Sequence, residues 1–199
     1  MVIVMKTTRT YTMRARAERV QQTRDRILDA VLSLVDEVPL AACTLPAIAE
    51  RADVSVQTVL RAFGSREGLS EAALERNLPV MLAERPADPN DRRRSIEALI
   101  DHYELRGDGV LLMLGQETWE PIAARVTTLG KRLHREWVEA AFADVVGATN
   151  GASRIALVDL LVAATDVYAW KLWRRDAGRS RNETVDRMLR LTESITGHP

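Results

Sequence analysis

The stretch that decides the fold is TLPAIAERADVSVQTVLRAF, residues 44–63. Thr44 can cap a short helix by accepting a hydrogen bond from a backbone N–H group. Pro46 is tolerated in the first turn of that helix, because the first N–H groups have no intrahelical partner. Ser55 is the natural cap of a second short helix over residues 56–63. The stretch therefore predicts two short helices joined by a tight turn.

Two short helices in this order form a helix-turn-helix, in which the first crosses the DNA backbone and the second enters the major groove. Apolar residues at both ends of the turn would lock the two helices together, namely Ile48, Ala49, Val54, Val59 and Phe63. The rest of the second helix points outward and is free to face DNA. Its outward residues are Val56, Gln57, Thr58, Leu60 and Arg61.

Helical periodicity continues on both sides of this stretch, and no run alternates as a half-buried strand would. Upstream, residues 24–38 predict a helix that Pro39 stops. Downstream, Gly107-Asp108-Gly109 is expected to open a short buried helix. We expect an all-α fold of about nine helices, the later ones over residues 70–84, 96–103, 110–114, 122–147, 153–176 and 180–195.

Composition narrows the function classes. The chain has 28 Lys and Arg residues against 28 Asp and Glu residues, so affinity for nucleic acid must come from the placement of charge. The single cysteine, Cys43, cannot form an internal disulfide and fits a reducing compartment. The apolar start is too short for a signal peptide, and no apolar run is long enough to cross a bilayer. We therefore expect a cytoplasmic protein without a membrane partner.

The helix-turn-helix stretch and its flanks resemble the TetR family of transcriptional regulators. The resemblance rests on residues 44–49 and 54–63, on Ser65-Arg66-Glu67-Gly68-Leu69, and on the upstream run Arg26-Ile27-Leu28-Asp29-Ala30. It spans about fifty residues and includes the helix that precedes the motif. It implies a three-helix DNA-binding domain followed by a helical ligand-binding and dimerisation domain.

The resemblance also assigns roles to individual residues. Thr44, Thr58 and Arg66 are expected to contact phosphates, whereas Val56, Gln57 and Arg61 are expected to contact bases. Gln suits adenine, Arg suits guanine and Val suits the thymine methyl group. For Arg61, a solvated or phosphate-bound side chain is the alternative. The full DNA-binding set is Thr44, Ser55, Val56, Gln57, Thr58, Leu60, Arg61 and Arg66.

Three residues depart from the family pattern. Asp53 stands where a glycine is common in the turn, Gln57 replaces a small residue, and Leu60 replaces a tyrosine that commonly touches phosphate. Asp53 weakens the electrostatic attraction of DNA, and Leu60 offers it no hydrogen bond. A helical ligand-binding protein with a vestigial DNA-binding domain therefore remains the alternative function.

The sequence predicts three parts. Residues 1–19 are expected to form a basic flexible arm, residues 20–69 the helix-turn-helix domain, and residues 70–199 the ligand-binding and dimerisation domain. The first sixteen residues contain no acidic residue, so the arm could lie along phosphates or be a solvated tail. Its basic residues there are Lys6, Arg9, Arg14 and Arg16.

The C-terminal half resembles the family at residues 134–137 and 168–178. The resemblance implies that the last two long helices pair with their copies in a four-helix interface, and that a pocket lies inside the preceding helices. Asp159 and Asp166 are expected to pair with arginines across the dimer, or alternatively to recognise a cationic ligand. The interface set is Ala156, Asp159, Leu160, Ala163, Val167, Met188 and Leu191.

Large apolar side chains with polar tips are the candidates for effector contact, because small-molecule sites are usually apolar cavities with a few polar groups. They are Tyr103, Met113, Trp119, Trp137 and Trp173, and ordinary core packing is the alternative role for each. The sequence has no metal-ligand spacing, Gly-rich phosphate loop or nucleophile elbow, so we expect neither a cofactor nor an enzyme.

Together these features predict a one-component repressor. Two copies of the chain would hold a palindromic double-stranded DNA operator and release it when a small apolar or aromatic effector binds.

Overall fold

The computed structural model describes residues 5–197, which are helical with short connections and contain no strand. The predicted fold class is confirmed. The described residues form two compact units, the first ending at Leu74 and the second beginning at Glu75. The boundary falls within a helix, α4 (Arg66–Glu84), rather than between residues 69 and 70 as predicted.

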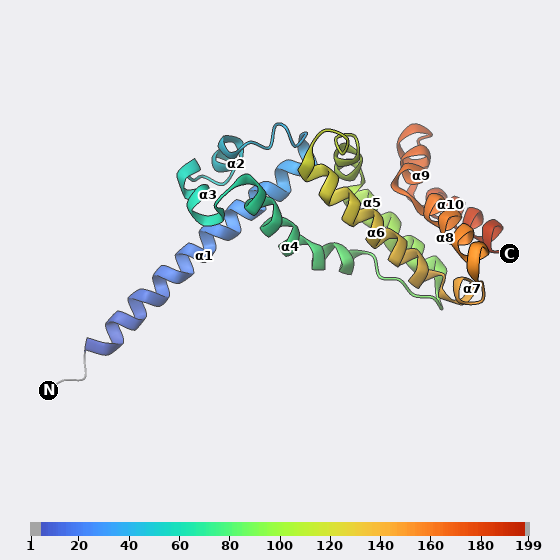
Figure 1. Cartoon of the computed structure of the whole chain (residues 1–199), viewed down its shortest axis with the longest axis horizontal. Helices are drawn as coiled ribbons and strands as arrows, with labels where there is room; N and C mark the ends of the chain where they lie inside the picture. The colour runs from blue at the N-terminus through green and yellow to red at the C-terminus, as the bar shows by residue number, and fades with distance from the viewer. Residues whose placement is uncertain (1–4, 198–199) are drawn as a thin grey trace. The chain divides into compact units, whose positions relative to one another are not determined.

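The first unit contains α1 (Met5–Glu37), α2 (Leu45–Arg51), α3 (Val56–Phe63) and the start of α4, shown in blue to green in Figure 1. α2 packs against α1, and α3 packs against α2. The side chains that these helices bury are apolar, apart from one free cysteine. They are Ile27, Leu28, Ala30, Val31, Leu34, Leu40, Cys43, Ile48, Ala49, Ala52, Val59, Leu69 and Ala73.

α1 begins earlier than the sequence prediction. Residues 5–19 were expected to belong to a flexible arm, but they form the first turns of α1. No proline or glycine interrupts α1, and its early turns contain Arg14-Ala15-Arg16-Ala17, in which both residue types are good helix formers. The prediction of an arm is thus corrected for residues 5–19, and its residues 1–4 lie outside the described part of the chain.

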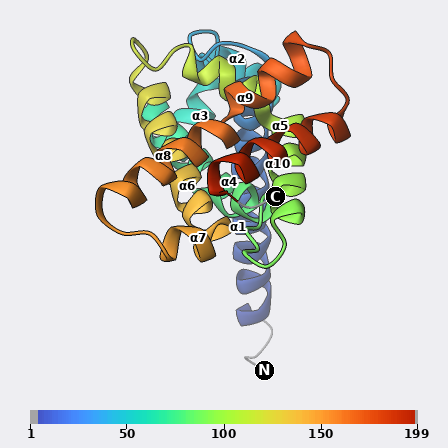
Figure 2. The ribbon, with the colours of Figure 1, turned by 90° about the vertical axis from the view of Figure 1, so that its right-hand side faces the viewer.

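The second unit starts in the last turns of α4 and contains the remaining helices. Its sixteen-residue core is formed mainly by α5, α6, α8, α9 and α10. α8 and α10 pack side by side (Figure 2). The elements are α5 (Arg92–Leu114), α6 (Pro121–Ala141), α7 (Ala143–Gly147), α8 (Gly151–Thr165), α9 (Val167–Lys171), a π-helical turn η1 (Leu172–Asp176) and α10 (Arg181–Thr196).

Several helix boundaries in this unit differ from those expected. The predicted helix over residues 122–147 is divided at Phe142, between α6 and α7. Gly107 lies inside α5 and does not open a new helix. Its lack of a side chain lets Trp170 pack against the backbone of α5, because a Cβ there would lie 2.5 Å from the indole ring. The predicted helix over residues 153–176 is divided at Asp166, whose backbone is extended and whose carboxylate accepts a hydrogen bond from Tyr168 N at 2.8 Å. Asp166 thereby caps α9.

Trp170 connects α9 to α5. Its indole N–H donates to Glu104 Oε1 at 2.9 Å. The same carboxylate accepts two hydrogen bonds from Arg174, at 2.6 and 2.8 Å, and the Arg175 guanidinium lies over the indole at 4.6 Å. The indole is thus fixed on three sides, which explains why α5 needs a glycine beneath it.

Candidate nucleic-acid interface

α3 begins at the cap that the sequence predicts and ends at a glycine. The Ser55 hydroxyl accepts a hydrogen bond from Thr58 N at 3.2 Å, and Gly64 ends the helix with a φ of 79°. α2 begins in the same way, since the Thr44 hydroxyl accepts from Ala47 N at 3.3 Å. These caps fix where each helix starts, and so which residues of α3 face outward.

The turn between α2 and α3 passes through Asp53, the one described residue other than glycine with a positive φ, at 52°. Glycine adopts this left-handed conformation without cost, which explains the glycine in the family pattern. Aspartate is one of the few other residues that tolerates it. The turn therefore forms with Asp53, and its carboxylate is exposed beside α3.

α3 separates a buried face from an outward one. Val59 is 1 % exposed and holds α3 in the core of the first unit. On the outward side Gln57 and Arg61 are exposed, while Val56, Thr58 and Leu60 are half-buried. Gln57 and Arg61 are four residues apart and so lie on one face, as a pair of base-reading side chains would.

Arg24 of α1 positions the end of α3, a role that the sequence did not reveal. Its guanidinium donates to the carbonyl of Ala62 and lies over the Phe63 ring, 4.3 Å from the ring centre. The two bonded residues are 38 positions apart in the chain, so no local pattern links them. Arg24 stabilises the last turn of α3 and, with it, the orientation of Arg61.

An ion pair fixes α2 on α1. Arg51 donates to both carboxylate oxygens of Glu37, at 2.9 and 2.8 Å, and also to the Ser33 hydroxyl. The hydrogen bonds from Arg51 and then Ser33 lower the pKa of Glu37 to about 2. Arg51 therefore links α2 to α1, and its charge is partly neutralised by Glu37.

Arg66 differs from the other predicted DNA contacts. Its guanidinium is half-buried and donates to the carbonyl of Leu40 at 2.8 Å, which ties the start of α4 to the connection after α1. Gly68, in the same turn, allows a close approach, since a Cβ there would lie 2.4 Å from the Phe63 carbonyl oxygen. The Ser65–Leu69 segment therefore packs against the C-terminal end of α3.

The comparisons with known proteins agree with this geometry. The family model described as bacterial regulatory proteins, tetR family, matches residues 27–73, from the middle of α1 through the motif. Over this segment the chain is similar to the DNA-binding region of the TetR family.

Curated proteins to which this chain is similar carry the name HTH-type transcriptional regulator BetI. The protein from Paraburkholderia phytofirmans is 34% identical over 82 residues, which is 38% of this chain and 42% of that protein. That match thus spans less than half of the relative's length. The protein from Burkholderia mallei is 27% identical over 181 residues, covering 83% of this chain and 93% of the relative.

Solved structures share the fold at low sequence identity. A transcriptional regulator from Rhodococcus sp. Rha1 superposes with a TM-score of 0.64 at 18% identity, covering 87% of this chain and 96% of the other. A TetR-like regulator from Rhodococcus sp. RHA1 gives 0.64 at 15% identity, covering 88% and 96%. The arrangement of helices in each unit is therefore one that solved proteins adopt.

In the described part of the chain the five predicted effector residues lie in different surroundings. Tyr103 and Trp137 are buried in the core of the second unit, and Met113 and Trp173 are half-buried. Trp119, in contrast, is 59% exposed, so it lines no interior. Core packing accounts for Trp173, which lies against the core cluster.

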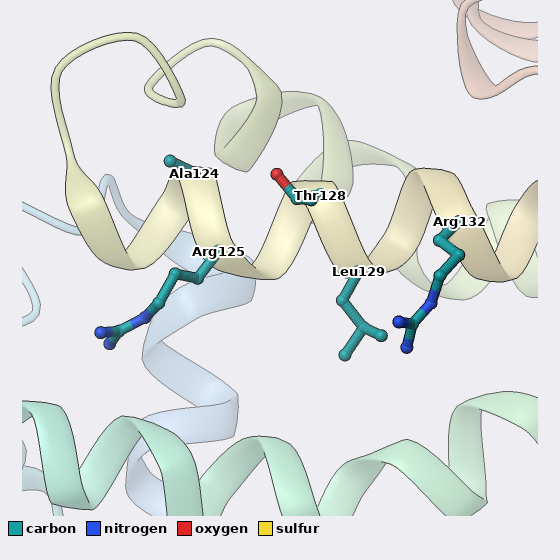
Figure 3. Close-up of a pocket in the computed structure, with 5 residues that line it drawn as sticks. All are labelled: Ala124, Arg125, Thr128, Leu129 and Arg132. Atoms are coloured by element: carbon teal, nitrogen blue, oxygen red, sulfur yellow. The ribbon is translucent and has the colours of Figure 1, made fainter.

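A hollow of about 400 Å³ lies instead over one side of α6 (Figure 3). The side chains of Arg125, Leu129 and Arg132 extend from the same side of α6 (Figure 3). None of the predicted effector residues lines this hollow. The lining residues are Ala124, Arg125, Thr128, Leu129 and Arg132. The sequence offers no signal for this hollow beyond a basic stripe at helical spacing.

Only some of the residues predicted for the dimer interface are exposed to solvent. Ala156, Ala163 and Leu160 on α8 are exposed, as is Leu191 on α10. Val167 and Met188 are buried in the core of their own unit, at 3% and 0% exposure, and so are not available for an intersubunit contact. Their apolar spacing along the helices arises from packing in this core.

The two acidic residues expected to pair across the dimer have partners within the chain. Asp159 accepts a hydrogen bond from Arg135 of α6 at 2.6 Å, and Asp166 caps α9. The sequence analysis could not separate these contacts from intersubunit ones. Within residues 5–197, no helix has both the length and the apolar character that a membrane span requires.

Proposed function

We propose that this chain is a one-component transcriptional repressor, which binds a palindromic operator as a homodimer and releases it when a small molecule binds the second unit. The observation that carries the proposal is the outward face of α3. Gln57 and Arg61 are exposed on a helix that is capped by Ser55, anchored by Val59 and tied down by Arg24. Such a helix presents polar side chains in a fixed register.

The proposed contacts fall into two classes. Gln57, Arg61 and Val56 read base edges, which determines the operator sequence. Thr44, Ser55 and Thr58 contact phosphates and fix the register of the motif. Arg66 and Leu60 flank these contacts, and Arg66 also keeps its bond to Leu40.

The exposed apolar face of α8 and α10 supports the dimer. Ile155 and Leu160 of α8 are 57% and 56% exposed, and Leu191 of α10 is 40% exposed. Ala156 and Ala163 lie between them and allow two helices to approach closely. Two copies joined here would place their α3 helices on successive turns of the DNA, about 34–36 Å apart. Substitution of Leu160 by Arg should give monomers in light scattering.

The test is binding of DNA from the region upstream of the chain's own gene, measured by fluorescence anisotropy at several salt concentrations. We expect affinity to fall steeply with salt, because phosphate contacts release counterions. Arg61→Ala should reduce the preference for the specific site by roughly 1–3 kcal/mol, whereas Thr58→Ala should weaken all sequences alike. Arg190, an exposed arginine on α10, provides the matched control, and Arg190→Ala should change nothing.

A salt-independent affinity that Arg61→Ala leaves unchanged would contradict the proposal. The alternative function, a helical ligand-binding protein with a vestigial DNA-binding domain, would then apply. Retained operator affinity in ligand-saturated protein would overturn the release step alone.

A further inference from the structure

The second unit buries a charged side chain without a partner. Arg85 follows α4 and is only 7% exposed. Its Nε–H group has no acceptor in the described part of the chain, and no carboxylate described there pairs with its guanidinium. Arginine stays ionised in proteins, and burial of an unpaired charge is costly. Such a group is expected to have an anionic partner in the working state of the protein.

The nearest carboxylate in sequence cannot fill this role, because it is already bonded. Glu84 accepts hydrogen bonds from Arg106 at 2.6 and 2.9 Å, and its Oε2 lies 2.8 Å from His102 Nδ1. The pKa of Glu84 is lowered chiefly by the bond from Arg106. Glu84 and Arg106 therefore neutralise each other, and the charge of Arg85 remains.

Two further orphaned atoms lie on one face of α6. Trp137 is 6% exposed, and its indole N–H has no acceptor among residues 5–197. The ring of His134 stacks on that indole, with the centres 5.9 Å apart and the planes at 9°. His134 Nδ1 is the second orphan. Contacts within the unit lead from the segment of Arg85 to this face of α6: its neighbour Glu84 lies 2.8 Å from His102 Nδ1. The Tyr103 hydroxyl donates to the carbonyl of Thr165 at 3.0 Å, and the Thr165 hydroxyl lies 3.1 Å from His134 Nε2. The charge of Arg85 also lowers the pKa of His134, after the larger effect of burial.

The other ring nitrogen of His134, Nε2, has a polar partner, so the unpaired atom of this ring within the described residues is Nδ1. Thr165 Oγ1 donates to the carbonyl of Leu161 at 2.7 Å and lies 3.1 Å from His134 Nε2. Nε2 therefore has a partner, and Nδ1 is the ring nitrogen without one among residues 5–197.

We propose that the effector of this chain is a small monocarboxylate with an apolar or aromatic body, whose carboxylate binds Arg85 and the indole N–H of Trp137. The inference rests on the proposed function, because it names the ligand class of the effector site. A single negative charge matches Arg85, the one arginine that is buried among residues 13–197. The Tyr103 ring packs 5.9 Å from that of Trp170 in the same core and provides the apolar surroundings.

The test compares carboxylates with their neutral amides on the full chain. The probes are benzoate with benzamide and hexanoate with hexanamide, and binding is measured by calorimetry and thermal shift. We expect a carboxylate to bind and its amide to fail. Arg85→Met should weaken carboxylate binding roughly tenfold or more, since it removes a charge-assisted bond. Trp137→Phe, which keeps the packing, should weaken it several-fold.

Arg125→Met is the matched control, because it removes an arginine from the hollow on α6 and should leave affinity unchanged. Circular dichroism checks that each variant is folded. The proposal is overturned if neither carboxylate binds, if the amides bind as well, if Arg85→Met keeps wild-type affinity, or if only Arg125→Met loses it. Operator binding without carboxylate binding would refute this inference alone, and the reverse result would refute the proposed function alone.

Discussion

The two units of this chain bury different kinds of side chain. Every buried polar or charged residue in the described chain lies in the second unit, including Arg85, His102, His134 and Thr165. The first unit buries apolar side chains and one cysteine, and keeps its ion pair between Arg51 and Glu37 at the surface. The apolar core fixes the position of α3, whereas the buried polar groups of the second unit can respond to pH.

The tryptophans allow this comparison to be measured. All four, Trp119, Trp137, Trp170 and Trp173, lie in the second unit. Tryptophan fluorescence therefore reports the unfolding of that unit, and far-ultraviolet circular dichroism reports both.

Acid should destabilise the second unit through His134. Burial, followed by the charges of Arg85 and His102, lowers its pKa from 6.5 to about 4. The unfolded state therefore binds a proton that the folded state does not, and stability falls as the pH drops through this interval, by about 3 kcal/mol. Denaturant titrations followed by fluorescence should show this loss, and His134→Gln should flatten it. Equal slopes in both proteins would contradict the assignment.

Gly107→Ala should destabilise the second unit by about 2 kcal/mol, because the new Cβ meets the Trp170 ring at 2.5 Å. Gly130→Ala is the matched control. Gly130 is also helical, on α6, with no atom within 4 Å of a new Cβ, so alanine there should stabilise by up to about 1 kcal/mol. Thermal unfolding followed by fluorescence compares the two variants, and a loss of stability in both would refute the packing explanation.

Arg24→Ala should destabilise the first unit by about 1.5 kcal/mol, since it removes the bond to the Ala62 carbonyl and the contact with the Phe63 ring. Fluorescence should not detect the change, whereas circular dichroism should. The exposed neighbour Arg26 serves as the control. If Arg26→Ala had the same effect, the general loss of charge on α1 would explain the result.

Asp53→Gly should stabilise the first unit by about 1 kcal/mol, because glycine adopts the positive φ at this position without strain. The variant also removes a negative charge beside α3, so DNA affinity should rise at low salt. Asp53→Ala removes the same charge but keeps the strain. A matching gain in stability from alanine would show that charge, rather than backbone conformation, was the cause.

Features that depend on residues close together in the chain were predicted correctly, and features without such a local signal were not. The caps at Thr44 and Ser55 were predictable, because a capping side chain bonds to a backbone N–H only three residues away. The start of α1 and the break at Asp166 were missed. α1 continues because nothing in its sequence stops it, and Asp166 ends a helix in a stretch whose periodicity does not change.

The sequence by itself determined the all-helical class, the helix-turn-helix at residues 44–63 and the TetR resemblance, since each depends on patterns within a few turns of chain. Only the tertiary structure decided what holds α3 in place, why Gly107 is a glycine, and which polar groups are buried without partners. Arg24 and Ala62, Gly107 and Trp170, and Arg85 and His134 meet because distant helices pack together. Burial and close contact arise from that packing and have no local signature.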